Sequence, residues 1–379
     1  MSQGLATPRP PASWRDWWPA TRDRLLASPR FQRWAGAFPL TRPIARRHAR
    51  AVFDLCAGFV YSQVLFACIQ LRVFERLRDG PESLDTLASA TRLPLDGART
   101  LLDAAVSLKL LERRDGGRYG LGPLGAATLG NAGIAAMVEH HDVLYGDLHD
   151  PIALLRGEVK DTALSRYWAY ARSAAPSQLG ADDVAEYSRL MATSQSLVAE
   201  EILDAYPIGQ HRCVLDVGGG EGVFLLSAAR RSPGLQCMLF DLPAVAERAR
   251  ARFAQAGVPG QAFGGDFRRD ALPRGADVVS FVRVLHDHGD DTVRILLRSA
   301  FEALPAGGTL LVAEPMARTG GAEPMGDAYF GLYLTAMGSG RPRSTDELHS
   351  MVSEAGFRDI RTPRTRQPLQ TGVLVARRP

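Results

Sequence analysis

The stretch Cys213-Val-Leu-Asp-Val-Gly-Gly-Gly-Glu-Gly222 decides the fold of this chain. An apolar β run opens it, four glycines follow within five positions, and an amphipathic helix is expected directly afterwards, at Val223–Arg231. A strand that leads through a glycine turn into a helix places the turn at the carboxyl edge of a parallel sheet, where such folds bind ligands. The stretch therefore predicts an α/β domain with a nucleotide-type site at this turn.

Strand and helix patterns alternate across residues 207–379. Apolar β runs are predicted at Arg212–Val217, Gln236–Asp241, Gln261–Phe263, Asp277–Val284, Thr309–Glu314 and Thr371–Ala376. Amphipathic helices are predicted at Val223–Arg231, Ala244–Ala256, Asp291–Leu304 and Thr345–Ala355. Apolar strands that alternate with such helices predict a doubly wound, Rossmann-like α/β domain.

Acidic and aromatic residues follow the next strands of this domain. Asp241 ends the second strand about twenty residues past the turn, which is the place of a carboxylate that accepts ribose hydroxyls. Asp266 follows the third strand and precedes Phe267, so that a carboxylate can bind the adenine amino group beside a ring that lies against the base. The alternative is that each aspartate only caps the helix after it. With the turn, the two carboxylates predict an adenosine pocket.

The glycine turn departs from the fingerprint of dinucleotide-binding domains. Gly218 and Gly220 belong to a G-x-G-x-G pattern, and Val223 stands where G-x-G-x-x-G needs its last glycine. The carboxylate of Glu221 would in addition repel a pyrophosphate. We therefore expect an adenosine ligand without phosphates.

Ahead of residue 207 the chain divides into three predicted parts, of which residues 1–48 form an arm rich in Trp, Pro and Arg. Residues 1–50 hold ten arginines and two aspartates, although the whole chain carries only +4. Such an arm can lie on a membrane surface, where indole rings sit at the headgroups and cations face anionic lipid, or it can pack over a partner subunit. The apolar stretch Leu55–Leu71 is shorter than the roughly 20 residues that cross a bilayer, so we expect a buried interface helix.

Residues 49–124 are predicted to form an α-helical, winged-helix-like unit. Two short helices precede a hairpin that turns at Asp115-Gly116-Gly117. The second helix, Asp96–Leu110, carries mainly Leu, Ala and Val, with Arg99 and Lys109 as its basic residues. A helix that reads DNA presents more basic side chains, so the unit predicts dimerisation and no nucleic-acid partner.

Residues 125–206 are predicted to be helical and to cover the ligand site of the last domain. They are rich in aromatic and methionine side chains, and most of these are expected in the core. We predict that some face a hydrophobic ligand, with His141, Tyr145 and Met191 as the candidates.

The cysteines and histidines argue against a metal site. The four cysteines lie in apolar runs without ligand spacing, and the chain shows no export signal, which predicts a reduced, cytoplasmic protein. The run His286-Asp287-His288 could suggest zinc or manganese, but no further ligand cluster accompanies it. We expect no metal.

Six motifs occur in order along the last domain: Val214–Gly222, Phe240–Pro243, Gly265–Phe267, Arg283–Asp287, Ala306–Gly308 and Val312–Pro315. Their order and spacing resemble those of the class I O-methyltransferases of the plant caffeate and bacterial polyketide type, over residues 50–379. The resemblance implies a helical dimerisation domain, a homodimer, and S-adenosylmethionine as the cofactor. It puts the following residues at the cofactor: Gly218, Gly220, Asp241, Asp266, Phe267 and Arg283.

The resemblance also implies a mechanism. Methyl transfer is an in-line displacement at a sulfonium methyl, so the enzyme aligns an acceptor oxygen and takes up its proton. In the resembled family the residue at the position of His286 is the base, and the carboxylate at Glu314 accepts its other N–H. A second family glutamate is often found where this chain has Pro342, so we expect His286 to be a weaker base. The alternative is a loop histidine that only bonds the backbone.

The segment Asp327–Met337 predicts an apolar wall for the acceptor. Phe330, Tyr333 and Met337 fall on one helical face of it, which favours a large hydrophobic acceptor.

Motifs of the arm and the first long helix indicate a subgroup. Phe31–Trp34, Phe38–Pro43 and Phe53–Gln63 resemble the carotenoid O-methyltransferases of purple bacteria. This resemblance implies as acceptor the tertiary 1-hydroxyl of an acyclic carotenoid, hydroxyneurosporene or demethylspheroidene. Two alternatives remain open: an O- or C-methyltransferase of an aromatic polyketide or a bacteriochlorophyll precursor, and a DNA-binding regulator that senses S-adenosylmethionine.

Overall fold

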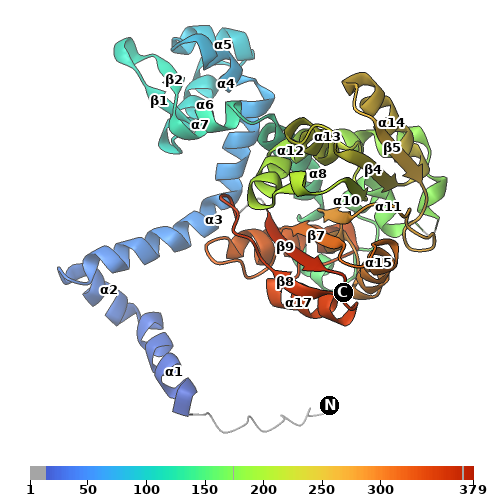
Figure 1. Ribbon diagram of the computed structural model, residues 1–379. Coiled ribbons are helices and arrows are strands. Elements are labelled where there is room, and N and C mark those ends of the chain that lie inside the picture. Colours follow the sequence, from blue (N-terminus) through green and yellow to red (C-terminus); the bar gives the residue numbers. More distant parts are fainter. Residues whose placement is uncertain (1–13, 174, 369–370) are drawn as a thin grey trace. The chain divides into compact units, whose positions relative to one another are not determined.

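The computed structural model describes residues 14–173, 175–368 and 371–379 (Figure 1). They divide into two compact units. The first contains the described residues up to Val73 together with Gly80–Gly120, and the second contains Phe74–Asp79 together with Leu121–Pro379.

Three helices open the first unit: α1 (Trp14–Ala27), α2 (Pro29–Ala37) and α3 (Arg42–Gln70). Proline is the first residue of α2 and the second residue of α3. The N–H groups of the first helical turn have no partner within the helix, so proline, which lacks an N–H, costs no hydrogen bond there. Almost every described side chain of α1 and α2 is exposed; Ala35 is the buried one. The large exposed apolar side chains of α1 and α2 are Trp17, Trp18, Leu25, Leu26 and Trp34.

The helix α3 is longer than the sequence pattern predicted. It has 29 residues and is apolar enough to cross a membrane by length and composition, whereas the apolar stretch alone is too short. Only 11% of its most apolar window is buried within the chain. Cys68 and Ile69 are buried at its end, but Phe53 and Leu55 are exposed. The prediction of a buried interface helix concerns burial against a partner subunit, so it stays a prediction for the exposed part of α3.

The remainder of the first unit has the winged-helix-like order that the sequence predicted. The helices α5 (Leu84–Thr91) and α6 (Leu95–Ser107) precede the strands β1 (Leu111–Arg113) and β2 (Tyr119–Leu121). Gly116 joins the two strands with a φ of 70°, in the left-handed region that favours glycine. Ala98, Leu102 and Ala105 of α6 are buried, so the apolar side of that helix lies inside the unit.

A seven-stranded sheet forms the centre of the second unit, in the order β5-β4-β3-β6-β7-β9-β8. Its strands are β3 (Cys213–Val217), β4 (Gln236–Asp241), β5 (Gly260–Gly264), β6 (Val278–Val282), β7 (Thr309–Glu314), β8 (Arg358–Arg361) and β9 (Gly372–Arg377). The first five are parallel, and β9 runs antiparallel to β7. The order reverses at β3, so the glycine turn after β3 lies at the switch point where such sheets bind ligands.

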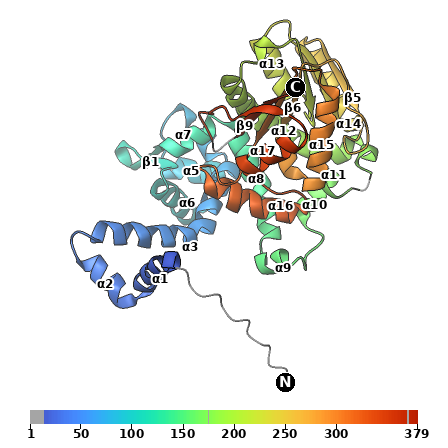
Figure 2. The ribbon, with the colours of Figure 1, turned by 60° about the horizontal axis from the view of Figure 1, so that its bottom comes forward.

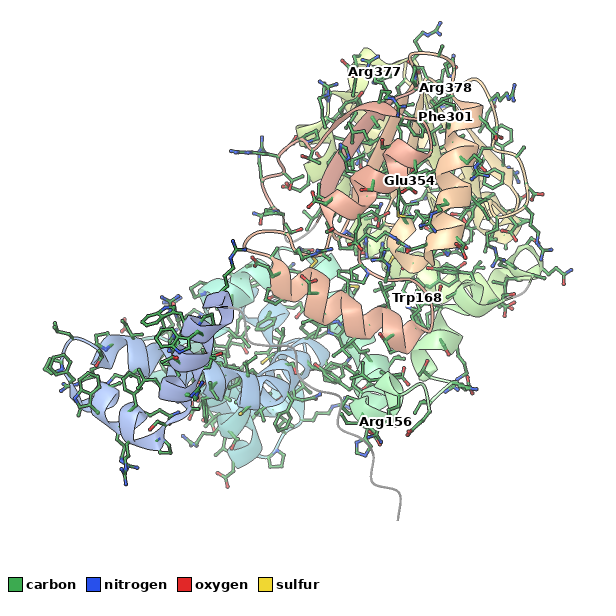
Figure 3. All side chains as sticks on the ribbon, turned by 90° about the horizontal axis from the view of Figure 1, so that it is seen from below. Arg156, Trp168, Phe301, Glu354, Arg377 and Arg378 are labelled. Carbon is green, nitrogen blue, oxygen red and sulfur yellow. The ribbon has the colours of Figure 1, made fainter. Side chains whose placement is uncertain are left out.

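The strand β8 was not predicted. It has four residues, Arg-Asp-Ile-Arg, and lies mostly exposed at the sheet edge, so it lacks the apolar run of an inner strand. Next to it, Arg378 follows β9 and places its guanidinium 4.7 Å from the ring centre of Phe301 (Figure 3).

Helices cover both faces of the sheet (Figure 2). On one face α15 (Asp290–Ala303) and α17 (Thr345–Glu354) pack against the strands, in a cluster that includes Leu296 and Val352. On the other face lie α12 (Ala181–Ala205), α13 (Val223–Arg231) and α14 (Pro243–Ala256). The doubly wound, Rossmann-like fold predicted from the sequence is thus confirmed.

A third buried cluster joins shorter helices to α12. These are α8 (Ala132–Asp147), α9 (Pro151–Leu155), α10 (Ala163–Tyr167), α11 (Ala169–Arg172), a π-helix (Pro324–Phe330) and α16 (Gly331–Met337). Two more short helices complete the chain, α4 (Val73–Arg76) and α7 (Pro123–Leu129). The cluster is rich in aromatic rings, among them Trp168, which is 4% exposed (Figure 3).

Candidate active site

A cavity of about 120 Å³ opens at the carboxyl ends of β3, β4 and β6. Seven of the residues predicted for the site line it: Met191, Gly218, Gly220, Asp241, Asp266, Phe267 and Arg283. The other seven lie outside this lining: His141, Tyr145, His286, Glu314, Phe330, Tyr333 and Met337. All of the lining residues belong to the second unit.

The glycine turn forms one wall of the cavity. Gly218 and Gly220 have φ angles of 70° and 59°, a backbone conformation that side-chain-bearing residues rarely adopt. Space is short as well: a Cβ on Gly219 would lie 2.5 Å from a carboxylate oxygen of Asp216. The glycines therefore allow both the turn itself and its close approach to the end of β3.

Asp241 connects the turn to the end of β4. One carboxylate oxygen accepts the N–H of Gly220 at 2.8 Å, and the other accepts the N–H of Leu242 at 2.7 Å. Burial raises the pKa of Asp241 to about 6, while these two bonds act in the opposite direction. Each oxygen keeps a free lone pair, so the carboxylate can still accept two hydroxyls from the cavity.

Asp266 is more constrained than the sequence suggested. Its two oxygens bind the guanidinium of Arg268, at 3.0 Å from Nε and 3.1 Å from Nη2. Burial would raise the pKa of Asp266, but the bonds with Arg268 lower it below its ordinary value. An adenine amino group would share this carboxylate with an arginine, and the predicted adenine contact stays a prediction. Phe267 lies beside it, with its ring edge toward His288.

Glu221 does not carry the repulsive charge that the sequence analysis assigned to it. It forms ion pairs with Arg248, at 2.6 Å, and with Arg252. The charge in the turn is compensated, so the argument against a pyrophosphate rests on the missing glycine alone.

Arg283 stands at the end of β6 in a strained backbone conformation, with a φ of 58°. Its guanidinium lines the cavity and donates to Ser194 Oγ at 3.0 Å. A positive φ costs conformational free energy in a residue other than glycine, so this conformation persists only where the surrounding structure fixes it. Such residues are frequent at functional sites. With Arg268, which is bound to Asp266, Arg283 is the second arginine in the lining of the cavity.

His286 and Glu314 form a buried pair at the ends of β6 and β7. His286 Nδ1 lies 2.5 Å from Glu314 Oε2. The other oxygen of Glu314 accepts the N–H groups of Val284 and Leu285, at 3.0 and 2.7 Å. The carboxylate thus holds both the ring and the turn that carries it.

A second carboxylate lies on the other side of the His286 ring. Asp287 Oδ1 is 3.2 Å from Nε2, and Asp287 Oδ2 accepts the phenol O–H of Tyr170 at 2.7 Å. Burial alone would lower the pKa of His286, but Asp287 and Glu314 raise it above its ordinary value. The loss of a family glutamate at Pro342 therefore does not leave His286 with a single carboxylate, as the sequence had suggested.

The residue after Pro342 supports the same turn. Arg343 is 2% exposed and donates to the carbonyl oxygens of Leu285 and His288, at 2.8 and 2.7 Å, and to Asp290. A buried arginine thus ties the segment before α17 to the turn that holds His286.

Most residues predicted for the acceptor lie in the aromatic cluster. Phe330 places its ring edge-on to His286, with centres 5.5 Å apart. Tyr333 is buried, and its hydroxyl lies 2.8 Å from His140 Nε2. His141 bonds the hydroxyl of Tyr329 at 2.7 Å and lies edge-on to Tyr145. Met337 is 1% exposed and packs in the core of this cluster. Their contact with an acceptor remains a prediction.

Three aromatic residues that sequence reasoning did not single out line the cavity: Trp168, Tyr170 and Tyr187. They lie next to one another, with ring centres 5.3 to 5.9 Å apart. A helical aromatic stripe is ordinarily core, so the sequence carried no signal to distinguish them. Asp287 could have been recognised as a site residue from the sequence, because it follows His286 directly at a strand end.

Within the described part of the chain, no group of three or more His, Cys, Asp and Glu side chains could hold a metal ion. Cys56, Cys68, Cys213 and Cys237 are all free thiols.

A cavity lined by carboxylates and glycines at the switch point of a doubly wound sheet is typical of enzymes that bind a nucleotide-type ligand. Two family patterns match the chain: an O-methyltransferase dimerisation domain over residues 53–131 and an O-methyltransferase domain over residues 145–358. The chain therefore belongs to the O-methyltransferase family, and the dimerisation domain supports a homodimer.

Individual relatives support the same conclusion. Demethylspheroidene O-methyltransferase of Cereibacter sphaeroides is 45% identical over 363 residues, which cover 94% of both chains. The enzyme of the same description from Rhodobacter capsulatus is 42% identical and covers 94% of this chain and 88% of its own. The crystal structure of human N-acetylserotonin methyltransferase with S-adenosylmethionine matches with a TM-score of 0.71 and 27% identity, over 87% of this chain and 97% of its own.

The protein is an S-adenosylmethionine-dependent O-methyltransferase. The cavity fits this cofactor, because Asp241 presents free lone pairs beside glycines that have no side chains to fill the space. The sulfonium supplies an activated methyl group when it is bound.

Proposed function

We propose that this enzyme transfers a methyl group from S-adenosylmethionine to the tertiary 1-hydroxyl of an acyclic carotenoid, hydroxyneurosporene or demethylspheroidene. The observation that carries the proposal is the 45% identity to a demethylspheroidene O-methyltransferase along 94% of both chains. A match of that length extends beyond the residues that the two family domains cover. A location in the cytoplasm suits a fold of this class.

We assign the following residue roles as part of this proposal. Asp241 binds the ribose hydroxyls, Asp266 and Phe267 hold the adenine, and the turn at Gly218 and Gly220 receives the methionine portion. His286, which is held by Glu314, takes part in the removal of the proton from the acceptor hydroxyl. No step needs a metal, because the methyl group is already activated by the positive sulfur.

The aromatic cluster supports a hydrophobic acceptor. Trp168, Tyr170, Tyr187 and Met191 line the cavity, and Phe330 lies next to His286. Apolar and aromatic side chains with a few polar groups are typical of pockets that bind apolar molecules. The carboxylates beside His286 provide the polar end at which a hydroxyl can be received.

Incubation with S-adenosylmethionine and a detergent-dispersed hydroxycarotenoid is expected to add the mass of one methylene per reacting hydroxyl, because a proton is replaced by a methyl group. Mass spectrometry of the extracted pigment measures this, with heat-inactivated enzyme as the control. Phenolic polyketides and bacteriochlorophyll precursors are tested in parallel. Turnover of these compounds without turnover of the carotenoid would contradict the proposal.

We further propose that the arm of α1 and α2 contacts the membrane in which such an acceptor dissolves. The 14 residues of α1 are at the length where an isolated helix is marginal in water, and their described side chains are almost all exposed, so this helix needs a surface to pack on. Indole rings and arginines together suit an anionic lipid interface. The family's dimerisation domain begins at residue 53, after both helices.

Replacing Trp17 and Trp18 with alanine is expected to weaken binding to anionic phospholipid vesicles at least about tenfold, because both rings would lose burial at the headgroups. Co-sedimentation with phosphatidylglycerol vesicles measures this. Leu155→Ala, at a side chain of similar exposure in the second unit, is the matched control. Unchanged vesicle binding together with a weakened dimer in sedimentation equilibrium would assign the arm to the partner subunit instead.

A further inference from the structure

Trp168 belongs to the aromatic wall of the cavity and lies at a break between two short helices. It separates α10 from α11 with a ψ of 61°, which is not helical, and its side chain is buried. Its indole contacts the rings of Tyr170 and Tyr187, with ring centres 5.9 and 5.5 Å apart. All three side chains line the cavity. The orientation of the indole therefore affects the two rings beside it.

The two tyrosines of this wall lie at different ends of the cavity. The Tyr170 hydroxyl donates to Asp287 Oδ2 at 2.7 Å, in the turn after β6. Burial raises the pKa of the Tyr187 phenol, and the nearby carboxylate of Asp241 at the end of β4 raises it further. A turn of the Trp168 indole would therefore displace groups at the proposed adenosine end and at the reactive end together.

A buried pair of hydrogen bonds holds the indole. Trp168 Nε1 donates to the Tyr333 hydroxyl at 2.7 Å, and that hydroxyl lies 2.8 Å from His140 Nε2. Tyr333 comes from α16 and His140 from α8, so three separate segments meet at one hydroxyl. Both side chains are buried and lie outside the lining of the cavity. The hydrogen bond to the indole links them to the cavity wall.

The chemistry of the three groups fixes the direction of both bonds. An indole nitrogen can only donate, so the Tyr333 oxygen accepts from Trp168 and keeps its own proton. A neutral imidazole offers one nitrogen as an acceptor for that proton. Burial lowers the pKa of His140 to about 4, and the neighbouring His141 acts in the same direction. At neutral pH Trp168 therefore donates to Tyr333, and Tyr333 donates to His140.

We propose that Tyr333 and His140 are positioning residues of the cofactor cavity, which hold the indole of Trp168 in the orientation that sets the aromatic wall. A buried indole N–H without an acceptor is unfavourable, so the ring would turn toward another partner if the Tyr333 hydroxyl were lost. That turn would displace the two tyrosine rings of the wall. The proposal concerns the cavity in which the cofactor binds, so it goes beyond the proposed carotenoid acceptor and does not depend on it.

Replacing Tyr333 with phenylalanine is expected to weaken the binding of S-adenosylhomocysteine about tenfold, because the indole loses its acceptor while the ring that packs beside it is kept. Isothermal titration calorimetry of the full-length enzyme measures this without any acceptor, so an error in the proposed function would leave the result unchanged. Tyr206→Phe is the matched control. Tyr206 is equally buried and its hydroxyl lies 2.7 Å from His211 Nε2, but it does not line the cavity. We expect this control to bind like the wild type.

Two further comparisons separate positioning from a general loss of stability. The double variant Trp168→Phe/Tyr333→Phe is expected to bind no more weakly than Trp168→Phe alone, because Tyr333 then has no indole to hold. The amide oxygen of glutamine can accept the same hydroxyl, so His140→Gln is expected to stay within about twofold of the wild type. His140→Leu, which offers no acceptor, is expected to behave like Tyr333→Phe.

The indole can also be observed directly. Fluorotryptophan incorporated into the enzyme gives one fluorine NMR signal per tryptophan, and Trp168→Phe identifies the signal of this residue among the five. We expect Tyr333→Phe to shift that signal and Tyr206→Phe to leave it in place. Unchanged affinity and an unchanged Trp168 signal in Tyr333→Phe would overturn the proposal. Additive losses in the double variant, or an equal loss in Tyr206→Phe, would overturn it as well.

Discussion

Replacing Asp241 with alanine is expected to weaken the binding of S-adenosylhomocysteine about a thousandfold, since a charged group loses two hydroxyl partners and each such hydrogen bond is worth about 1.5–3 kcal/mol. The variant also leaves the N–H of Gly220 without its partner, so the glycine turn loses its tie to β4. Isothermal titration calorimetry measures the affinity. Circular dichroism verifies the fold.

The pH dependence of the same affinity gives a second measurement. Because burial raises the pKa of Asp241 to about 6, this carboxyl is protonated below that pH in the free enzyme, and the proton competes with the ribose hydroxyls. Affinity is therefore expected to rise with pH through about 6 and to level off above it. Asp241→Asn, which keeps the shape, should lose this dependence, and Glu302→Ala, at an exposed site on α15, should keep it. An Asp241→Asn variant with wild-type affinity at every pH would contradict the assignment of the ribose site.

Replacing Gly340 with alanine is expected to lower the free energy of unfolding by about 3 kcal/mol. Alanine is strained in the left-handed backbone conformation of this residue, and its Cβ would also be overpacked against a neighbour. Gly340 has a φ of 78°, and a Cβ there would lie 2.1 Å from the His286 carbonyl oxygen. The clash is with backbone, so the turn that carries His286 and Asp287 must move. Displacements of about 1 Å can cost a hundredfold in rate, and we expect kcat to fall by at least that much.

Guanidinium unfolding and steady-state kinetics test this prediction together. Gly321→Ala is the matched control, because Gly321 has a similar φ of 80° but no atom within 4 Å of its Cβ position. The control should therefore lose only the backbone contribution, about 1 kcal/mol, and keep its turnover. Equal losses in the two variants would show that the contact with the His286 turn is unimportant.

The two predictions concern the two ends of one site. Asp241 belongs to the proposed adenosine end, where backbone N–H groups hold a carboxylate in place. Gly340 belongs to the reactive end, where Glu314 and Arg343 hold a turn from opposite sides through its N–H and carbonyl groups. The cofactor end is thus organised by local chain geometry, and the reactive end by contacts between distant segments.

The sequence alone determined the fold, and it identified the glycine turn and Asp241, which the structure brings to one cavity. Apolar runs that alternate with amphipathic helices specify which segments form strands and which form helices, and at β4 and β7 the predicted and observed bounds agree. Glycines with positive φ and a carboxylate at a strand end are local requirements, so Gly218, Gly220 and Asp241 could be recognised from their neighbours in the chain. The edge strand β8 was missed because an exposed strand carries no apolar run.

Only the tertiary structure decided how the reactive end is arranged. Tyr170 and Asp287 are 117 positions apart and His286 and Glu314 are 28 apart, yet each pair is hydrogen-bonded, and Asp287 Oδ1 lies 3.2 Å from His286 Nε2. Spacing along the sequence cannot show this, because the direction of each side chain at a strand end depends on how separate helices and strands pack. For the same reason the sequence could not show that Arg268 is hydrogen-bonded to Asp266. It also could not show that Asp287, rather than His286, lines the cavity.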